Sequence, residues 1–287
     1  MFKKIKNYFH YYLLGVLFLA TVFVWYAVYV ESPSGKLKVY FLDVGQGDAE
    51  LIETPNGNKI LIDGGPPNKK ILGELSRFLP FYNRSVDMVI LTHPHADHVG
   101  GLDQVLERYE VGFAMDPGVL YNTPEFGEYR NLIETKRIPR VYGVRGMKVR
   151  LDYSTYLDVL LPVVNNFGLS PHDGMLVLKL NYGKNSFLFT GDMEKNLEGY
   201  LIGTMGESLK SDILKVGHHG SKTSTTEAFL GYVSPKYAVI SVGEENKYGH
   251  PSKEVLDRLI QFGVKFFRTD EEGTIRMKSD GETVSIF

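Results

Sequence analysis

The longest apolar run of the chain lies close to its N-terminus. From Tyr11 to Val30 no residue is charged. A helix over this run, rising about 1.5 Å per residue, would be about 30 Å long, which matches the hydrocarbon core of a bilayer. The pattern predicts four segments, namely a basic N-terminus at 1–10, a transmembrane anchor at 11–30, a linker at 31–36 and a large domain at 37–287.

The charges beside the apolar run predict its orientation. Lys3, Lys4 and Lys6 precede the run and Glu31 follows it. The positive-inside rule therefore puts the N-terminus in the cytoplasm and the large domain outside, at the cell membrane. A cleaved signal peptide is the alternative. The run ends in WYAVYV, which lacks a small-x-small cleavage site and is typical of an aromatic interface belt, so an uncleaved single-pass anchor is favoured.

Beyond the anchor, short apolar segments of strand character alternate with segments of helical spacing. The first strands form a meander around the turn sequence PNGN, and a second strand-rich half begins near Met147. Two such halves with external helices predict an α/β fold, a four-layer αββα sandwich with its site at the strand ends between the halves. Strands are predicted at 37–44, 50–54, 59–62, 86–91, 155–161, 175–182, 186–190, 212–216 and 237–242, and helices at 71–79, 124–136, 194–202, 225–232 and 253–262.

Composition and charge limit the kinds of binding and catalysis that the chain can support. The 287 residues are 43% hydrophobic, which is enough for a substantial core. Only one of the 34 acidic residues, but four of the 32 basic residues, lie before residue 37, so the large domain is mildly acidic. Any polyanion must therefore bind locally, at metal ions or a basic loop. The chain has no cysteine, which excludes disulfides, thiol nucleophiles and thiolate zinc sites.

Four metal-ligand side chains occupy one short segment. The sequence THPHADH at 92–98 contains His93, His95, Asp97 and His98. An apolar strand precedes it, and Pro94 prevents that strand from continuing. Zinc and manganese accept neutral imidazole and carboxylate ligands, and four of these within six residues are hard to explain by packing alone. We interpret the segment as a metal-binding loop.

Two clusters that follow later strands could complete the site. Asp192, in TGD, could bridge two cations, although a helix N-cap is the alternative. One of His218 and His219, in GHHGSKT, could complete a metal shell, and the sequence does not distinguish them. Ser221 and Lys222 in the same loop could hold an anion such as phosphate, although an ordinary turn would also explain the glycines and the serine.

Five further residues are predicted to assist from nearby loops. His250, in YGHP, could donate a proton to a leaving group or could be an ordinary loop histidine. Asp43, Gln46, Asp48 and Asp63 lie in or just after predicted strands. We expect these four to orient loops or ligands rather than to react.

In this order, the clusters resemble the metallo-β-lactamase superfamily. Its H-x-H-x-D-H signature matches the segment from His93 to His98, and Asp63 and Asp192 match its earlier and later aspartates. The segments FLDVGQGDA, LIDGG, LTHPHADHVGGL, FLFTGD, LKVGHHGSKTS, ISVG and YGHP are similar to the C-terminal domain of ComEC-type DNA-internalisation competence proteins. This resemblance covers Lys36 to Phe287.

The resemblance implies a hydrolase that uses two divalent metal ions, zinc or manganese. His172 could supply a ligand that ComEC-like domains lack, or it could be a bystander. Asp97 need not be the general base if the metal ions activate the water. The implied ligands are His93 and His95 with His172 for one ion, Asp97 and His98 with His218 or His219 for the other, and Asp192 as the bridge. The candidate catalytic or substrate-orienting residues are Asp97, Ser221, Lys222 and His250.

Three functions remain open at this stage. The first is hydrolysis of phosphodiesters in single-stranded or fragmented nucleic acid. The second is hydrolysis of a small ester, lactone, amide or envelope phosphodiester, and the third is a non-catalytic metal-binding accessory protein. Competence proteins carry a multi-helix channel, so with one anchor this chain would need a separate membrane channel protein to import DNA. The sequence does not indicate an oligomeric state.

Overall fold

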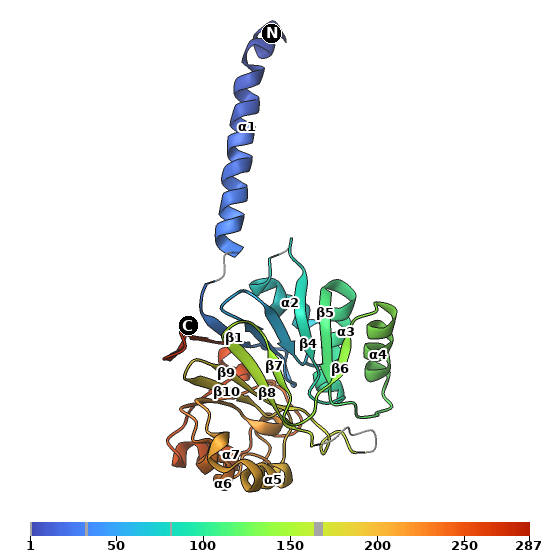
Figure 1. Cartoon of the computed structure of the whole chain (residues 1–287), viewed down its shortest axis with the longest axis vertical. Coiled ribbons are helices and arrows are strands. Elements are labelled where there is room, and N and C mark those ends of the chain that lie inside the picture. The colour runs from blue at the N-terminus through green and yellow to red at the C-terminus, as the bar shows by residue number, and fades with distance from the viewer. Residues whose placement is uncertain (1, 32–33, 81, 164–168) are drawn as a thin grey trace. The chain divides into compact units, whose positions relative to one another are not determined.

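The structure is a computed structural model that describes residues 2–31, 34–80, 82–163 and 169–287 (Figure 1). The chain divides into two units, Met1–Ser34 and Gly35–Phe287. Residues 32–33 of the predicted linker, and Met1 of the predicted basic segment, lie outside the described residues.

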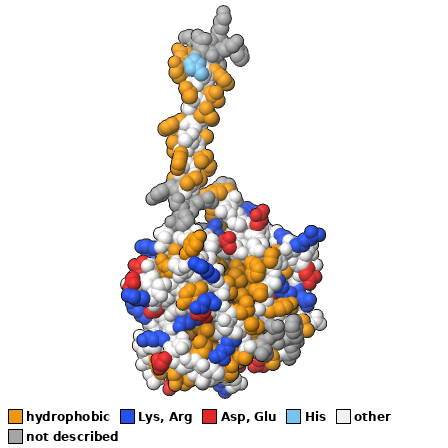
Figure 2. Space-filling model, in the orientation of Figure 1, with side chains coloured by type: hydrophobic (Ala, Val, Ile, Leu, Met, Phe, Trp, Pro, Cys, Tyr) orange, Lys and Arg blue, Asp and Glu red, His pale blue; other side chains and the backbone are white. Residues whose placement is uncertain are grey.

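The first unit is a single long helix, α1 (Phe2–Glu31). Its segment Tyr8–Val28 is long and apolar enough to cross a membrane. The most apolar stretch of this segment contains no buried residue. Figure 2 shows hydrophobic side chains along the helix. Phe18 and Trp25 are among the exposed ones. The helix makes a membrane span feasible by length and composition, whereas the predicted orientation and segment bounds stay predictions.

The second unit contains two mixed β-sheets. The first has the strand order β15-β14-β1-β2-β3-β4-β5-β6 and the second the order β13-β12-β11-β10-β9-β8-β7. The first sheet contains β1 (Leu37–Phe41), β2 (Glu50–Glu53), β3 (Lys59–Ile62), β4 (Ser85–Ile90), β5 (Glu110–Asp116), β6 (Arg140–Tyr142), β14 (Ile275–Ser279) and β15 (Val284–Ile286). The second contains β7 (Lys148–Arg150), β8 (Thr155–Leu161), β9 (Val177–Tyr182), β10 (Asn185–Phe189), β11 (Ile213–Lys215), β12 (Tyr237–Ile240) and β13 (Lys265–Arg268).

Helices cover the outer face of each sheet. The first sheet packs against α2 (Lys70–Phe78), α3 (Ala96–Arg108) and α4 (Pro124–Thr135). The second packs against α5 (Lys195–Met205), α6 (Glu227–Val233) and α7 (Lys253–Gln261). The remaining short helices are η1 (Gly206–Leu209), η2 (Gly217–Gly220) and α8 (Thr269–Glu272).

Three apolar cores hold the layers together. Successive strand side chains alternate between faces, so Phe187 and Phe189 of β10 point between the sheets while Leu188 points toward the helices. The middle core lies between the sheets, and each outer core lies between a sheet and its helices. Helix, sheet, sheet and helix therefore follow one another, which confirms the predicted four-layer αββα sandwich.

Parallel strands bring the predicted site residues to one edge. In the first sheet β3, β4 and β5 run parallel, and in the second β10, β11, β12 and β13 do. The carboxyl ends of parallel strands meet at the same edge of a sheet. The segments that follow β3, β4, β10 and β11 carry the conspicuous aspartates and histidines of the sequence.

Candidate metal centre

Seven of the chain's eight histidines gather at this edge. They are His93, His95, His98, His172, His218, His219 and His250. The predicted metal loop is shorter than expected, because α3 begins at Ala96 and includes Asp97 and His98 in its first turn. A helical turn directly after an extended segment points these side chains in several directions, so that one short sequence reaches two neighbouring positions.

The first group of ligand atoms comes from His93, His95, His172 and Asp192, all within 4.8 Å of one another. His93 Nε2 lies 3.0 Å from His95 Nδ1 and 3.6 Å from Asp192 Oδ2. The sequence did not decide whether His172 is a ligand. In the structure His172 reaches this group from the turn before β9.

The second group comes from Asp97, His98, Asp192 and His219, again within 4.8 Å. Asp192 Oδ1 lies 3.3 Å from His98 Nε2 and 3.4 Å from His219 Nε2. Asp192 belongs to both groups, as a bridging ligand would. The alternative role of Asp192 as a helix cap does not apply, because the N-cap of α5 is Glu194.

The buried polar atoms of the two groups fit cations. His98 Nε2, His219 Nε2 and Asp192 Oδ1 are buried and close together, yet none of them has a hydrogen-bond partner, and neither does His172 Nδ1. Leaving buried polar atoms without partners is costly. Atoms that converge on a shared point, rather than on one another, are the arrangement that divalent ions require, and imidazole and carboxylate are suitable donors.

The electrostatics of the cluster also favour bound positive charge. Burial by itself would raise the pKa of Asp192, but the charges of His98 and His219 outweigh it and hold that pKa well below its usual range. Burial would lower the pKa of His219, but Asp192 and Asp48 raise it to about 10. The acidic side chains therefore favour positive charge among them, which is the kind of charge that a bound divalent ion would supply.

Asp63, which was predicted to orient a loop or ligand, contacts His98. Its Oδ2 lies 2.8 Å from His98 Nδ1, and its Oδ1 accepts a 2.7 Å hydrogen bond from the Thr92 backbone. Both aspartate and histidine are fully buried. A carboxylate on the far nitrogen fixes the ring orientation of a ligand histidine and makes the ligand more basic.

Asp48 supplies a negative charge beside His219 and contacts a residue that sequence reasoning missed. Asp48 Oδ1 lies 3.2 Å from His219 Nδ1, and its Oδ2 lies 2.8 Å from Lys215 Nζ. Both members of the Lys215–Asp48 ion pair are 1% exposed. Lys215 is thus a buried cation placed directly behind a candidate ligand, and Glu50 is buried beside it.

The structure distinguishes His219, which belongs to a ligand group, from His218, which does not. His219 Nε2 belongs to the second ligand group, and its Nδ1 lies 2.9 Å from the Ser241 carbonyl oxygen. His218 directs Nδ1 to Glu194, at 3.2 Å, while its Nε2 is 3.7 Å from Asp192 Oδ2. Both residues adopt left-handed backbone angles, with φ of 48° and 53°. That local geometry points the two adjacent rings to different places.

The other predicted residues lie at varying distances from the ligand groups. His250 lines the pocket above them, a cavity of about 310 Å³ that Gln46 also lines. Asp43 Oδ1 accepts a hydrogen bond from the Gly45 backbone and so stabilises its own loop. Ser221 is buried with its hydroxyl 2.9 Å from that of Thr223, and Lys222 is exposed. Neither is among the described residues that line the pocket, so the predicted anion-holding role of these two gains no support from their placement.

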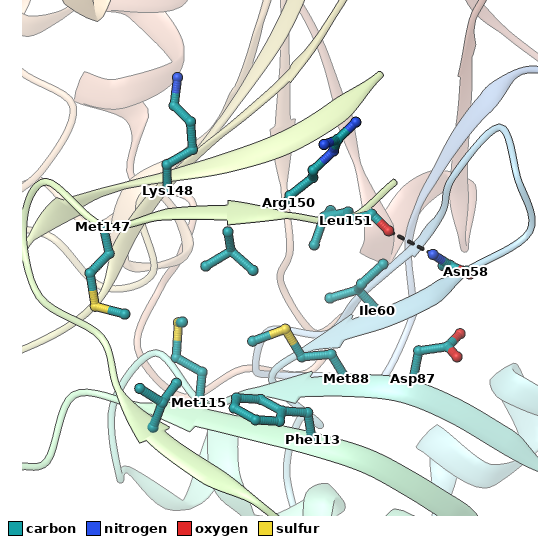
Figure 3. A pocket seen from close by; sticks show the side chains of 12 residues that line it. Asn58, Ile60, Asp87, Met88, Phe113, Met115, Met147, Lys148, Arg150 and Leu151 are labelled. Carbon is teal, nitrogen blue, oxygen red and sulfur yellow. Dashed lines mark hydrogen bonds between the residues drawn. The ribbon is translucent and has the colours of Figure 1, made fainter. Parts of the chain in front are cut away.

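A larger pocket of about 430 Å³ lies elsewhere, where β4 and β5 of one sheet face β7 of the other (Figure 3). Met88, Met115, Met147 and Phe113 line it. Its polar Asn58 already donates a 2.6 Å hydrogen bond to the Leu151 carbonyl oxygen, as Figure 3 shows. This apolar pocket contains none of the candidate ligands.

Comparisons with known proteins identify relatives of the chain. Over 273 residues the chain is 32% identical to ComE operon protein 3 of Bacillus subtilis, a match that covers 88% of this chain and 35% of that protein. Over 245 residues it is 31% identical to competence protein ComA of Neisseria gonorrhoeae, covering 85% of this chain and 32% of that protein. The chain thus spans about a third of the length of these relatives.

Solved structures share the fold. The diiron β-hydroxylase CmlA of Streptomyces venezuelae superposes with a TM-score of 0.55 at 14% identity, covering 85% of this chain and 54% of that one. The metallo-beta-lactamase fold protein YhfI of Bacillus subtilis superposes with a TM-score of 0.51 at 10% identity. The superposition covers 80% of this chain and 96% of YhfI. Residues 42–244 match the family model of the metallo-beta-lactamase superfamily. The chain therefore belongs to the metallo-beta-lactamase superfamily and is related to the ComEC-type competence proteins, as its motifs predicted.

Proposed function

We propose that this protein is a membrane-anchored phosphodiesterase that hydrolyses single-stranded or fragmented nucleic acid with the help of two divalent metal ions. The observation that carries the proposal is the pair of ligand groups that share Asp192 at the floor of an open pocket. Two adjacent cations suit phosphodiesters, because they neutralise both the attacking and the leaving oxygen. The relationship to competence proteins supports nucleic acid as the substrate class.

In this proposal the first ion is held by His93, His95 and His172, the second by Asp97, His98 and His219, with Asp192 between them. When bound, the ions supply Lewis acidity and make a water molecule more acidic. Asp97 then serves as a ligand and does not need to act as general base.

His250 is the proposed proton donor to the leaving oxygen. It lines the pocket, and its Nδ1 is buried without a hydrogen-bond partner. Burial, followed by the nearby charge of His218, lowers the pKa of its ring. Because a lowered pKa leaves less of the ring protonated at neutral pH, proton donation by His250 would be favoured at mildly acidic pH.

The anchor would keep the active site outside the cytoplasm. Tyr8–Val28 is the candidate span, and the lysines before it support a cytoplasmic N-terminus. A separate channel protein remains the proposed partner for any role in DNA import. A reporter enzyme fused after Phe287 should be active only in its extracytoplasmic form, and a cytoplasmic signal would reverse the proposed topology.

The activity is tested with the full chain in detergent, loaded with manganese or zinc. The substrates are single-stranded DNA, duplex DNA, RNA, a generic phosphodiester and lactones. We expect cleavage of single-stranded nucleic acid, which His93→Ala should abolish. His10→Ala is the matched control, because His10 is exposed on α1 and belongs to neither group of candidate ligands.

The other outcomes are equally informative. Turnover of a lactone or small ester without cleavage of any nucleic acid would refute the nuclease proposal in favour of a small substrate. Stoichiometric metal with no turnover of any substrate would favour an accessory protein. Undiminished metal-dependent activity in His93→Ala would overturn the assignment of the site.

A further inference from the structure

Six aromatic rings form a continuous belt around the pocket. In order they are Tyr121, His95, His172, His218, His250 and Tyr248, and all six line the pocket. The centroids of neighbouring rings are 5.4, 4.6, 5.4, 5.9 and 5.8 Å apart along this order. The belt therefore has a tyrosine at each end and imidazoles between them.

The terminal tyrosines are exposed. Tyr248 is 71% exposed and lies nearly parallel to His250, with an interplanar angle of 17°. Tyr121 is 38% exposed and meets His95 at 64°. Each tyrosine thus presents aromatic surface at the mouth of a pocket whose floor holds the ligand groups.

The loop that carries Tyr248 is held by its own hydrogen bonds. The Asn246 side chain accepts hydrogen bonds from the backbone of Tyr248, at 3.2 Å, and of His250, at 2.9 Å. It also donates a 2.7 Å bond to the His250 carbonyl oxygen. These bonds hold the backbone of the loop, while the exposed ring of Tyr248 lines the pocket, an arrangement that suits a partner from solution.

The pocket also lacks the usual means of holding a polyanion. Among the described residues that line it, none is lysine or arginine, and the large domain is mildly acidic. Protein cations therefore cannot supply most of the affinity for a nucleic acid strand. Stacking of bases on aromatic rings does not depend on charge, and it contributes substantially for each base in single-stranded complexes.

We propose that Tyr121 and Tyr248 each stack on a nucleobase, one on either side of the phosphodiester bond that is cleaved. This inference rests on the proposed function and deepens it, because it makes bases adjacent to the bond part of what is recognised. Duplex DNA would be a poor substrate, since its bases already stack on one another and are not available to the tyrosines.

The experiment uses the full chain and the dinucleotide d(TpT), which has one phosphodiester bond and a base on each side. Two analogues each replace one nucleoside with an abasic tetrahydrofuran. We expect Tyr248→Ala and Tyr121→Ala to lower kcat/KM on d(TpT) about tenfold. Each variant should lose nothing further on the analogue that lacks its own base. Tyr248→Phe and Tyr121→Phe, which keep the ring, should retain activity.

Two further measurements isolate the stacking. Tyr232→Ala is the matched control, because Tyr232 is 38% exposed on α6 and does not line the pocket. The anisotropy of a fluorescein-labelled oligothymidylate, measured with metal-free protein, reports binding without cleavage. The alanine variants should bind it about tenfold more weakly than the wild type.

The inference and the proposed function fail in different ways. If the wild type cleaves d(TpT) and both alanine variants match it, the stacking inference is wrong while the nuclease remains. An equal loss by the variants on d(TpT) and on the abasic analogues would also overturn stacking. If the wild type cleaves only substrates without bases, the proposed function itself is wrong.

Discussion

Replacing Lys215 with methionine removes the buried cation that faces Asp48. The two side chains are each 1% exposed and their charged atoms are 2.8 Å apart. Methionine approximates the length and apolar stem of lysine, so the main perturbation is the loss of charge. Asp48 then remains in a buried position, with His219 Nδ1 3.2 Å from its Oδ1.

The expected cost is large. Removing one partner of a buried ion pair typically destabilises a protein by about 3–5 kcal/mol, because the other charge is left uncompensated. Burial by itself raises the pKa of Asp48, and it is chiefly Lys215 that holds this pKa below its usual range. Without the lysine, Asp48 should bind a proton more readily and hold His219 less firmly. Loss of such an orienting contact commonly weakens metal binding about 10- to 100-fold.

Urea unfolding of the metal-free full chain measures the first effect, and cobalt titration followed by absorbance measures the second. The cobalt spectrum should show that one site weakens while the other is retained. Lys253→Met is the matched control, since Lys253 forms an exposed pair with Asp257 on α7 and should change neither result.

A second variant distinguishes loss of the ion pair from general misfolding. Lys215→Met combined with Asp48→Asn removes both charges and should recover most of the lost stability. It should still bind cobalt weakly at the site that includes His219. If Lys215→Met unfolds within about 1 kcal/mol of the wild type and binds both ions normally, a structural and orienting role for this ion pair is refuted.

Two other substitutions test the fold. Burial and then the charge of Glu128 raise the pKa of Asp103 to about 8; because the folded state holds this proton more tightly, stability falls as pH rises from about 4 to about 8. Asp103→Asn should therefore raise the melting temperature at pH 9 but not at pH 3, and equal effects at both would contradict the assignment. Gly101→Ala would place a Cβ 1.9 Å from the Gly64 carbonyl oxygen, so it should reduce soluble folded protein sharply, whereas Gly73→Ala, with open space around it, should not.

The sequence was most informative where chemistry and strand ends coincide. Asp63, His93 and Asp192 lie one to three residues after the ends of β3, β4 and β10. Within one sheet, the carboxyl ends of parallel strands meet at the same edge. The strand β5 was not predicted, because it begins with a charged residue, contains Gly112, and is buried only from Ala114 onward. Tertiary pairing with β4 makes it a strand despite that weak pattern.

Choosing between His218 and His219 required backbone geometry. Both residues have positive φ values, which residues with bulky side chains rarely adopt. A pair of adjacent histidines in a sequence does not predict that backbone conformation. A regular strand or helix would have predicted a different direction for each ring. The structure instead turns His219 inward to the ligand group and leaves His218 beside Glu194.

Lys215 was missed for a different reason, and that reason gives a usable signal. On β11, Ile213 faces the core between the sheets and Leu214 faces the helices, so alternation points Lys215 between the sheets. A lysine there is costly unless carboxylates compensate it, and Asp48 in the loop before β2 and Glu50 at the start of β2 do so. A charged residue on an otherwise apolar parallel strand, a few positions before a candidate ligand, therefore indicates a buried ion pair that supports the site.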